Sequence, residues 1–191
     1  MPFDPVALGS LWLPILVSAV AVFIASSIVW MVLPHHKQDW AAVPKEDTVM
    51  QALRDAGVGP GQYTLPNCGG DMAAMKDPVF QAKLAKGPVA FLVVGPNGNP
   101  QMGKYLSQWF VYTIVVSIFV AYLTSITAAA GTDYMRVFRI AGTVAFTSYS
   151  MAVIPQAIWK HMSWSMILKE VLDGLLYALL TAGVFGAFWP K

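Results

Sequence analysis

The chain has 191 residues, of which 57% are hydrophobic and only 12% are charged, and its mean hydropathy is +0.57. Soluble domains are nearer a quarter charged, so this surplus of apolar residues exceeds the needs of one soluble core and predicts a membrane protein. The net charge of +2, with dispersed basic residues, excludes a nucleic-acid-binding surface, and the single cysteine, Cys68, excludes an intramolecular disulfide and any thiolate cluster.

Four long stretches are predicted to cross the bilayer as helices. The first, residues 11–33, carries no charge and as a helix rises about 35 Å, enough for a hydrocarbon core of about 30 Å. It is expected to be uncleaved, because no lysine or arginine precedes it as in a secretory signal. The others are residues 106–130, 140–159 (interrupted by Pro155) and 167–189. The predicted fold class is an all-α integral membrane protein with four transmembrane helices and a small α+β extramembrane segment between the first two.

The tryptophans support this topology, because indole rings prefer the headgroup boundary. Trp12 and Trp189 fall at one predicted surface. The other surface is marked by the remaining tryptophans at span ends, which are Trp30, Trp109, Trp159 and Trp164.

Basic residues predict the orientation, since loops rich in lysine and arginine are retained in the cytoplasm. The side with the large segment carries nine: Lys37, Lys45, Arg54, Lys76, Lys83, Lys86, Lys104, Lys160 and Lys169. The opposite side carries three, Arg136, Arg139 and Lys191. We therefore expect a protein of the bacterial inner membrane with both termini outside and the large segment cytoplasmic.

The predicted domains are residues 1–33 (tail and first span), 34–105 (cytoplasmic α+β segment) and 106–191 (three further spans). Within the segment, turn residues and apolar runs predict two helices and two strands. The helices span residues 45–56 and 77–86, and the strands span residues 62–65 and 89–94. These short elements offer little core, so we expect the segment to rest on the membrane surface or on a partner.

Small residues recur every fourth position on the second and fourth spans, which lets helix backbones approach closely. Such ladders either hold the bundle together or mate with another subunit. The ladders are Ser117, Ala121, Ser125 and Ala129 on the second span, and Gly174, Ala178, Ala182 and Gly186 on the fourth. On their basis the first functional hypothesis is a non-catalytic accessory or scaffold subunit, whose partners are the lipid bilayer and other membrane subunits or further copies of itself.

Carboxylates near the start of the fourth span suggest a second function, a small oligomeric transporter or channel. Glu170 and Asp173 share one helix face that Tyr177 continues, while Gln156 follows the proline of the polar third span. These four residues are the predicted pathway or proton site. The alternative is an interfacial helix start in which Lys169 pairs with Asp173 four residues on.

Histidines suggest a third function, a haem- or metal-binding redox subunit. The predicted topology places all three histidines and one aspartate at the same surface: His35, His36, His161 and Asp39. Adjacent histidines in an extended stretch point to opposite sides, so the pattern is not a recognised ligand motif, and we expect no cofactor. No nucleophile or acid–base constellation favours an enzyme.

Overall fold

The structure, a computed structural model, describes residues 5–191; the start of the predicted N-terminal tail lies outside this range. The described chain forms two compact units. One combines the residues up to Trp40 with those from Gln101 onward, and the other is Ala41–Pro100.

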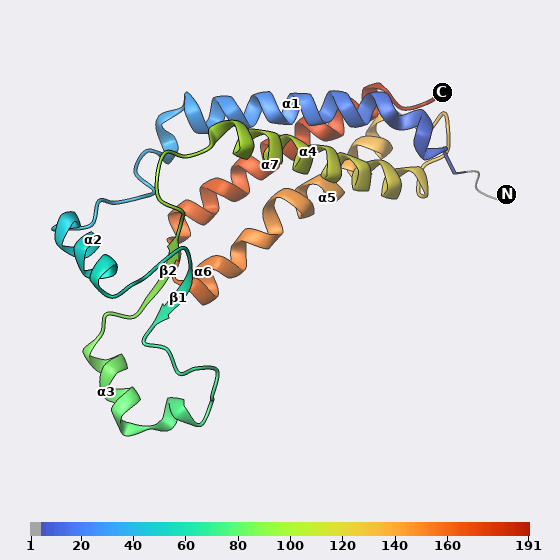
Figure 1. The fold of residues 1–191 in the computed structure, drawn as a ribbon. Coiled ribbons are helices and arrows are strands. Elements are labelled where there is room, and N and C mark those ends of the chain that lie inside the picture. Colours follow the sequence, from blue (N-terminus) through green and yellow to red (C-terminus); the bar gives the residue numbers. More distant parts are fainter. Residues whose placement is uncertain (1–4) are drawn as a thin grey trace. The chain divides into compact units, whose positions relative to one another are not determined.

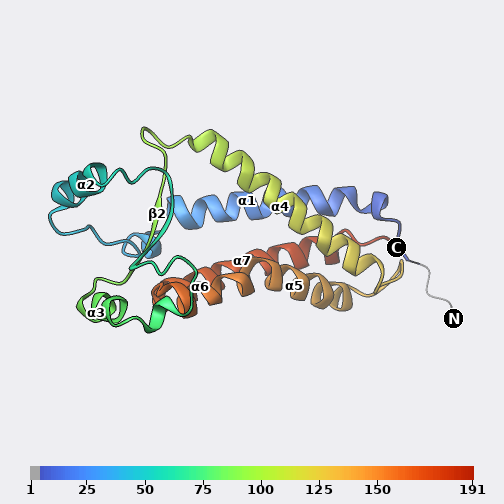
Figure 2. The ribbon, with the colours of Figure 1, turned by 60° about the horizontal axis from the view of Figure 1, so that its bottom comes forward.

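The first unit is a four-helix bundle (Figure 1). Its long helices are α1 (Trp12–Met31), α4 (Met102–Ser125), α5 (Tyr134–Ser150) and α7 (Trp164–Ala187). Helix α1 contacts α4 and α7, and α5 contacts the same two helices, so the four close a ring around a shared core (Figure 2). Successive long helices of this unit run in opposite directions (Figures 1 and 2).

Three helical stretches of the described chain are long and apolar enough to cross a membrane, namely Leu8–Met31, Met102–Ser125 and Tyr134–Lys160. The first includes the 3₁₀ turn Leu8–Leu11, which leads into α1. The helix of the fourth predicted span, α7, has 24 residues but is not one of the three. Its early turns carry Lys169, Glu170 and Asp173. A fourth crossing therefore stays a prediction.

The third stretch begins earlier than its sequence pattern indicates. Asp133 caps α5 by accepting a hydrogen bond from the backbone N–H of Arg136 at 3.0 Å, so the helix starts six residues before the predicted position 140. Near its end the helix tightens into a 3₁₀ turn, Met151–Val153, before α6 (Ile154–Lys160). Pro155 explains this change, because its ring has no N–H to give to the carbonyl of Met151 and clashes with it in an unbroken α-helix.

Hydrogen bonds to backbone carbonyls join the helix ends on one side of the bundle. The N–H of Gly131 donates to the carbonyl of Pro190 at 2.9 Å, and the indole N–H of Trp189 donates to the carbonyl of Ala129 at 2.9 Å. The N–H of Val6 likewise reaches the carbonyl of Ser125. The α4–α5 connection thus lies beside the start of α1 and the end of α7.

The second unit contains α2 (Glu46–Asp55), β1 (Gly61–Leu65), α3 (Pro78–Lys86) and β2 (Ala90–Val94). The strands pair antiparallel from Gly61 opposite Val94 to Leu65 opposite Ala90. Each element matches its predicted range to within one residue, and Asp77 caps α3 as expected by accepting from the N–H of Val79. None of residues 41–100 is buried, so this unit has no closed core.

Candidate functional site

A cluster of ionisable side chains joins the chain just after α1 to the first turns of α7. The 3₁₀ turn Pro34–His36 presents both histidines to Asp173. The Nε2 atom of His36 lies 2.7 Å from Oδ2 of Asp173, and Nε2 of His35 lies 3.3 Å from Oδ1 of the same carboxylate. In an extended stretch two adjacent histidines would point to opposite sides. Here they lie in a 3₁₀ turn instead, and their side chains converge.

His36 has a carboxylate at each ring nitrogen. Its Nδ1 atom lies 2.5 Å from Oδ2 of Asp39, while Nε2 faces Asp173. Both nitrogens donate only in the imidazolium form, so this geometry favours a charged ring. Burial by itself lowers the pKa of His36, but the hydrogen bonds and negative charges of Asp39 and Asp173 outweigh burial and raise the pKa above its usual value.

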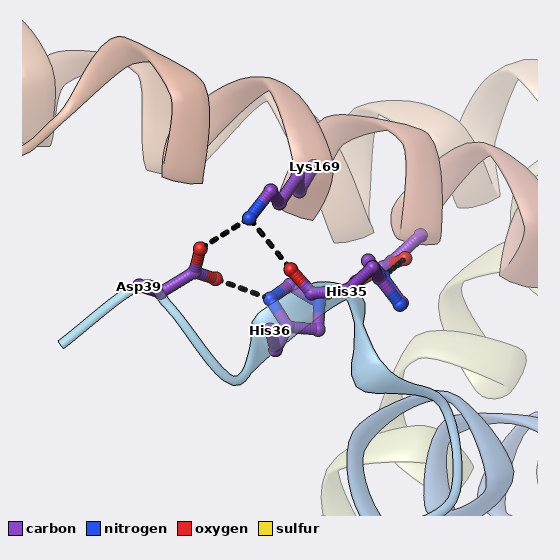
Figure 3. A network of polar contacts seen from close by, with 5 residues as sticks. His35, His36, Asp39 and Lys169 are labelled. Atoms are coloured by element: carbon purple, nitrogen blue, oxygen red, sulfur yellow. Dashed lines mark hydrogen bonds and ion pairs between the residues drawn. The ribbon is translucent and has the colours of Figure 1, made fainter.

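Lys169 completes the cluster (Figure 3). Its ammonium donates to Oδ1 of Asp39 at 2.5 Å and to the backbone carbonyl of His35 at 2.6 Å. The hydrogen bond that Asp39 accepts from Lys169 lowers the pKa of the Asp39 carboxyl most, and its hydrogen bond with His36 lowers that pKa further. The alternative interpretation of the sequence paired Lys169 with Asp173 along the helix; in the structure the ammonium pairs with Asp39 instead, and Asp173 contacts the two histidines.

The indole of Trp30 covers the cluster. Its ring stacks on that of His36, with centroids 3.9 Å apart and planes 5° from parallel. A cationic imidazole over an indole face gains cation–π attraction. Trp30, which the sequence predicts to lie at the membrane boundary, therefore also shields the charged ring.

A cavity of about 520 Å³ lies among the helices beside this cluster. Aromatic side chains from all four long helices form much of its wall, and neighbouring rings contact one another; they are Trp30, Trp109, Tyr112, Tyr149 and Tyr177. Ser26 and Ser27 add hydroxyls, and Glu170 and Asp173 add carboxylates. A mostly apolar wall with a few polar groups, at this volume, is typical of a small-molecule site.

Two hydroxyls in this wall have no hydrogen-bond partner. The oxygens of Tyr149 and Tyr177 are buried, and neither meets the geometry of a hydrogen bond with any described residue. Trp30 lies near the Tyr177 hydroxyl without reaching that geometry. An unpaired buried hydroxyl costs free energy, and neither oxygen is exposed to a water-sized molecule, so these two hydroxyls do not add to the open polar surface of the cavity.

Of the predicted pathway residues, Glu170, Asp173 and Tyr177 line the cavity. Gln156 lies in α6, outside the lining. Of the predicted metal ligands, His35, His36 and Asp39 lie together, whereas His161 follows the end of α6 in a left-handed conformation. Among the described residues the group with the spacing of metal ligands is His35, His36 and Asp173.

The small-residue ladders face the interior of the bundle. Two of their members are only partly buried: Gly186 in α7, and Ala129 just beyond the end of α4. The other six are buried, namely Ser117, Ala121, Ser125, Gly174, Ala178 and Ala182. The Ser117 hydroxyl meets that of Ser18 on α1 at 3.0 Å, so this ladder joins two helices of one chain. The ladders therefore give no support to the accessory-subunit hypothesis, which stays a prediction.

Comparison with known proteins gives no functional assignment: no family model matches the chain, and neither a curated protein nor a solved structure does. Function must be inferred from the cluster and the cavity themselves.

Proposed function

We propose that the chain is an integral protein of the bacterial inner membrane that crosses it four times and binds a small, largely apolar molecule in the cavity of its helical bundle. Both termini lie on the outer side of this membrane, and residues 34–105 lie in the cytoplasm. Binding of a solute within the membrane is the first step that the transporter hypothesis requires, and Glu170, Asp173 and Tyr177 are the predicted pathway residues that take part in it.

The packing of α7 supports its crossing of the membrane. It contacts α1 and α5, both of which belong to stretches of spanning length, and at 24 residues it is as long as α4. Its charged residues lie near its first turns, where a side chain reaches the interface at lower cost than at mid-membrane. The Trp189 bond to Ala129 brings the far end of α7 to the α4–α5 connection.

Labelling of single cysteines tests this topology. Two variants, Asp133→Cys and Lys191→Cys, are each made in a chain that also carries Cys68→Ser. In intact cells an impermeant maleimide is expected to label both variants. The same reagent is expected to label Cys68 of the unaltered chain only after lysis. Four crossings put residues 133 and 191 on the face opposite Cys68. If Lys191→Cys, like native Cys68, were labelled only after lysis while Asp133→Cys was labelled in intact cells, α7 would not cross.

The observation that carries the binding function is the cavity, whose wall is largely aromatic and includes the carboxylates of Glu170 and Asp173. A ligand that fits has a ring system to lie against the aromatic side chains and a polar group to meet the carboxylates. An aromatic amine has this chemistry.

Filling the cavity is expected to weaken binding. Ser27 lines the cavity from α1, so the indole of Ser27→Trp takes up ligand space. Saturable binding of the probe N-phenyl-1-naphthylamine to protein in nanodiscs should weaken by at least about tenfold, equivalent to about 1.4 kcal/mol. The matched control is Ser165→Trp, because Ser165 is exposed on α7 and outside the cavity wall. Non-saturable uptake alone, or equal binding by both variants, would exclude the cavity as a binding site.

A further inference from the structure

We infer that His35, His36 and Asp173 form a binding site for one divalent transition-metal ion. Each offers one ligand atom, and the three atoms lie within 4.8 Å of one another. Two imidazole nitrogens and a carboxylate oxygen at this spacing can converge on a single ion with bonds of about 2.0–2.2 Å. This inference goes beyond the proposed binding of a small molecule and does not require it.

The surroundings of His36 are those of a metal-binding histidine. Such a ligand usually donates its second ring N–H to a carboxylate, which fixes the ring and its tautomer. Asp39 holds this position at Nδ1 of His36, and Lys169 in turn fixes Asp39. The Nε2 atom therefore points toward Asp173 in a fixed orientation, so the site is supported beyond its direct ligands.

Charge also matches a divalent ion. The groups around the site are three carboxylates, Asp39, Glu170 and Asp173, and one ammonium, Lys169. With both histidines neutral, three negative charges and one positive charge leave −2. An ion of charge +2 balances this sum, and when it binds, the proton on Nε2 of His36 is released to water. Charge balance matters here because Asp39 and Asp173 are largely buried.

The ligand types select the class of ion. Imidazole nitrogen with one carboxylate suits zinc and divalent iron or cobalt, whereas magnesium and calcium prefer oxygen ligands. Three protein ligands leave at least one coordination position for another molecule. Because Asp173 belongs both to the ligand set and to the cavity wall, the ion lies at the edge of the cavity.

Cobalt titration tests the site. Protein freed of any polyhistidine tag and stripped with a chelator is expected to bind one Co²⁺ per chain, with visible absorption bands from nitrogen and oxygen ligands, and Zn²⁺ should displace it. His35→Gln should lose this binding while keeping its fold, since the His35 side chain is 35% exposed and its only hydrogen-bonding side-chain partner among the described residues is Asp173. Asp39→Asn, which keeps all three ligands, should weaken binding by about 10- to 100-fold.

His161→Gln and Cys68→Ser are the matched controls, since they remove the other histidine and the sole thiol without touching the ligand set. Both should bind Co²⁺ as the unaltered chain does. If the unaltered chain retains no Co²⁺, or His35→Gln binds it equally well, there is no such site. Binding of N-phenyl-1-naphthylamine is measured separately in the stripped protein, so a failure of either proposal is recognised independently of the other.

Discussion

Asp173→Ala is expected to lower the free energy of unfolding by about 3 kcal/mol, the lower end of the cost of removing one partner from a buried ion pair. One carboxylate contacts both histidines, and its side chain is only 10% exposed. Without it, the His35 side chain loses its hydrogen-bonding contact with α7, and the His36 ring keeps only Asp39 as a carboxylate partner. Unfolding by sodium dodecyl sulfate in mixed micelles, followed by circular dichroism, measures the change.

Glu170→Ala is the matched control for this loss. It removes a carboxylate from the same helix and the same cavity wall, but no hydrogen bond or ion pair joins the side chain of Glu170 to another described residue. Its free energy of unfolding should stay within about 0.5 kcal/mol of the unaltered chain. Similar losses in the two variants would mean that the histidine contacts do not stabilise the bundle.

Gly174→Ala is expected to destabilise the bundle by about 1–3 kcal/mol, the usual cost of overpacking a core. A β-carbon at Gly174 would collide with the hydroxyl of Ser150 and lie 3.2 Å from the backbone carbonyl carbon of Tyr149. Backbone atoms of α5 cannot move aside as a flexible side chain does, so the helices must separate. The same micelle unfolding experiment detects the loss.

Gly183→Ala provides the comparison on the same helix. A β-carbon there meets the hydroxyl of Tyr134 at an ordinary 3.8 Å. Alanine favours a helix over glycine, so this variant should be unchanged or more stable by up to about 1 kcal/mol. If Gly174→Ala were as stable as Gly183→Ala, close contact between α5 and α7 at this point would not matter for stability.

The helices were predictable because their signals are local. Long uncharged runs and span-end tryptophans located the hydrophobic helices, and Asp77-Pro78 and the glycine turns located the elements of residues 41–100. The start of α5 was missed because Asp133 is a cap that acts through its side chain, ahead of any apolar run.

The site was predictable only in part, because its partners are distant in sequence. His36 and Asp173 are separated by 137 residues, and nothing local to either residue indicates the other. Topology placed the histidines and the start of the fourth span at one surface, but the choice of Asp39 over Asp173 as the partner of Lys169 depends on the 3₁₀ turn after α1. The cavity wall was missed because Trp109, Tyr112 and Tyr149 resemble ordinary boundary or core aromatics until the helices are assembled.

The division of the chain into units has an evolutionary consequence. The bundle is built from the two ends of the sequence, and residues 41–100 stand between them as an insert does. Closing a longer flexible connection costs only about 0.6 kcal/mol for each doubling of its length. Selection can therefore enlarge, trim or exchange this insert at little thermodynamic cost, while the helices on either side remain constrained by their mutual fit.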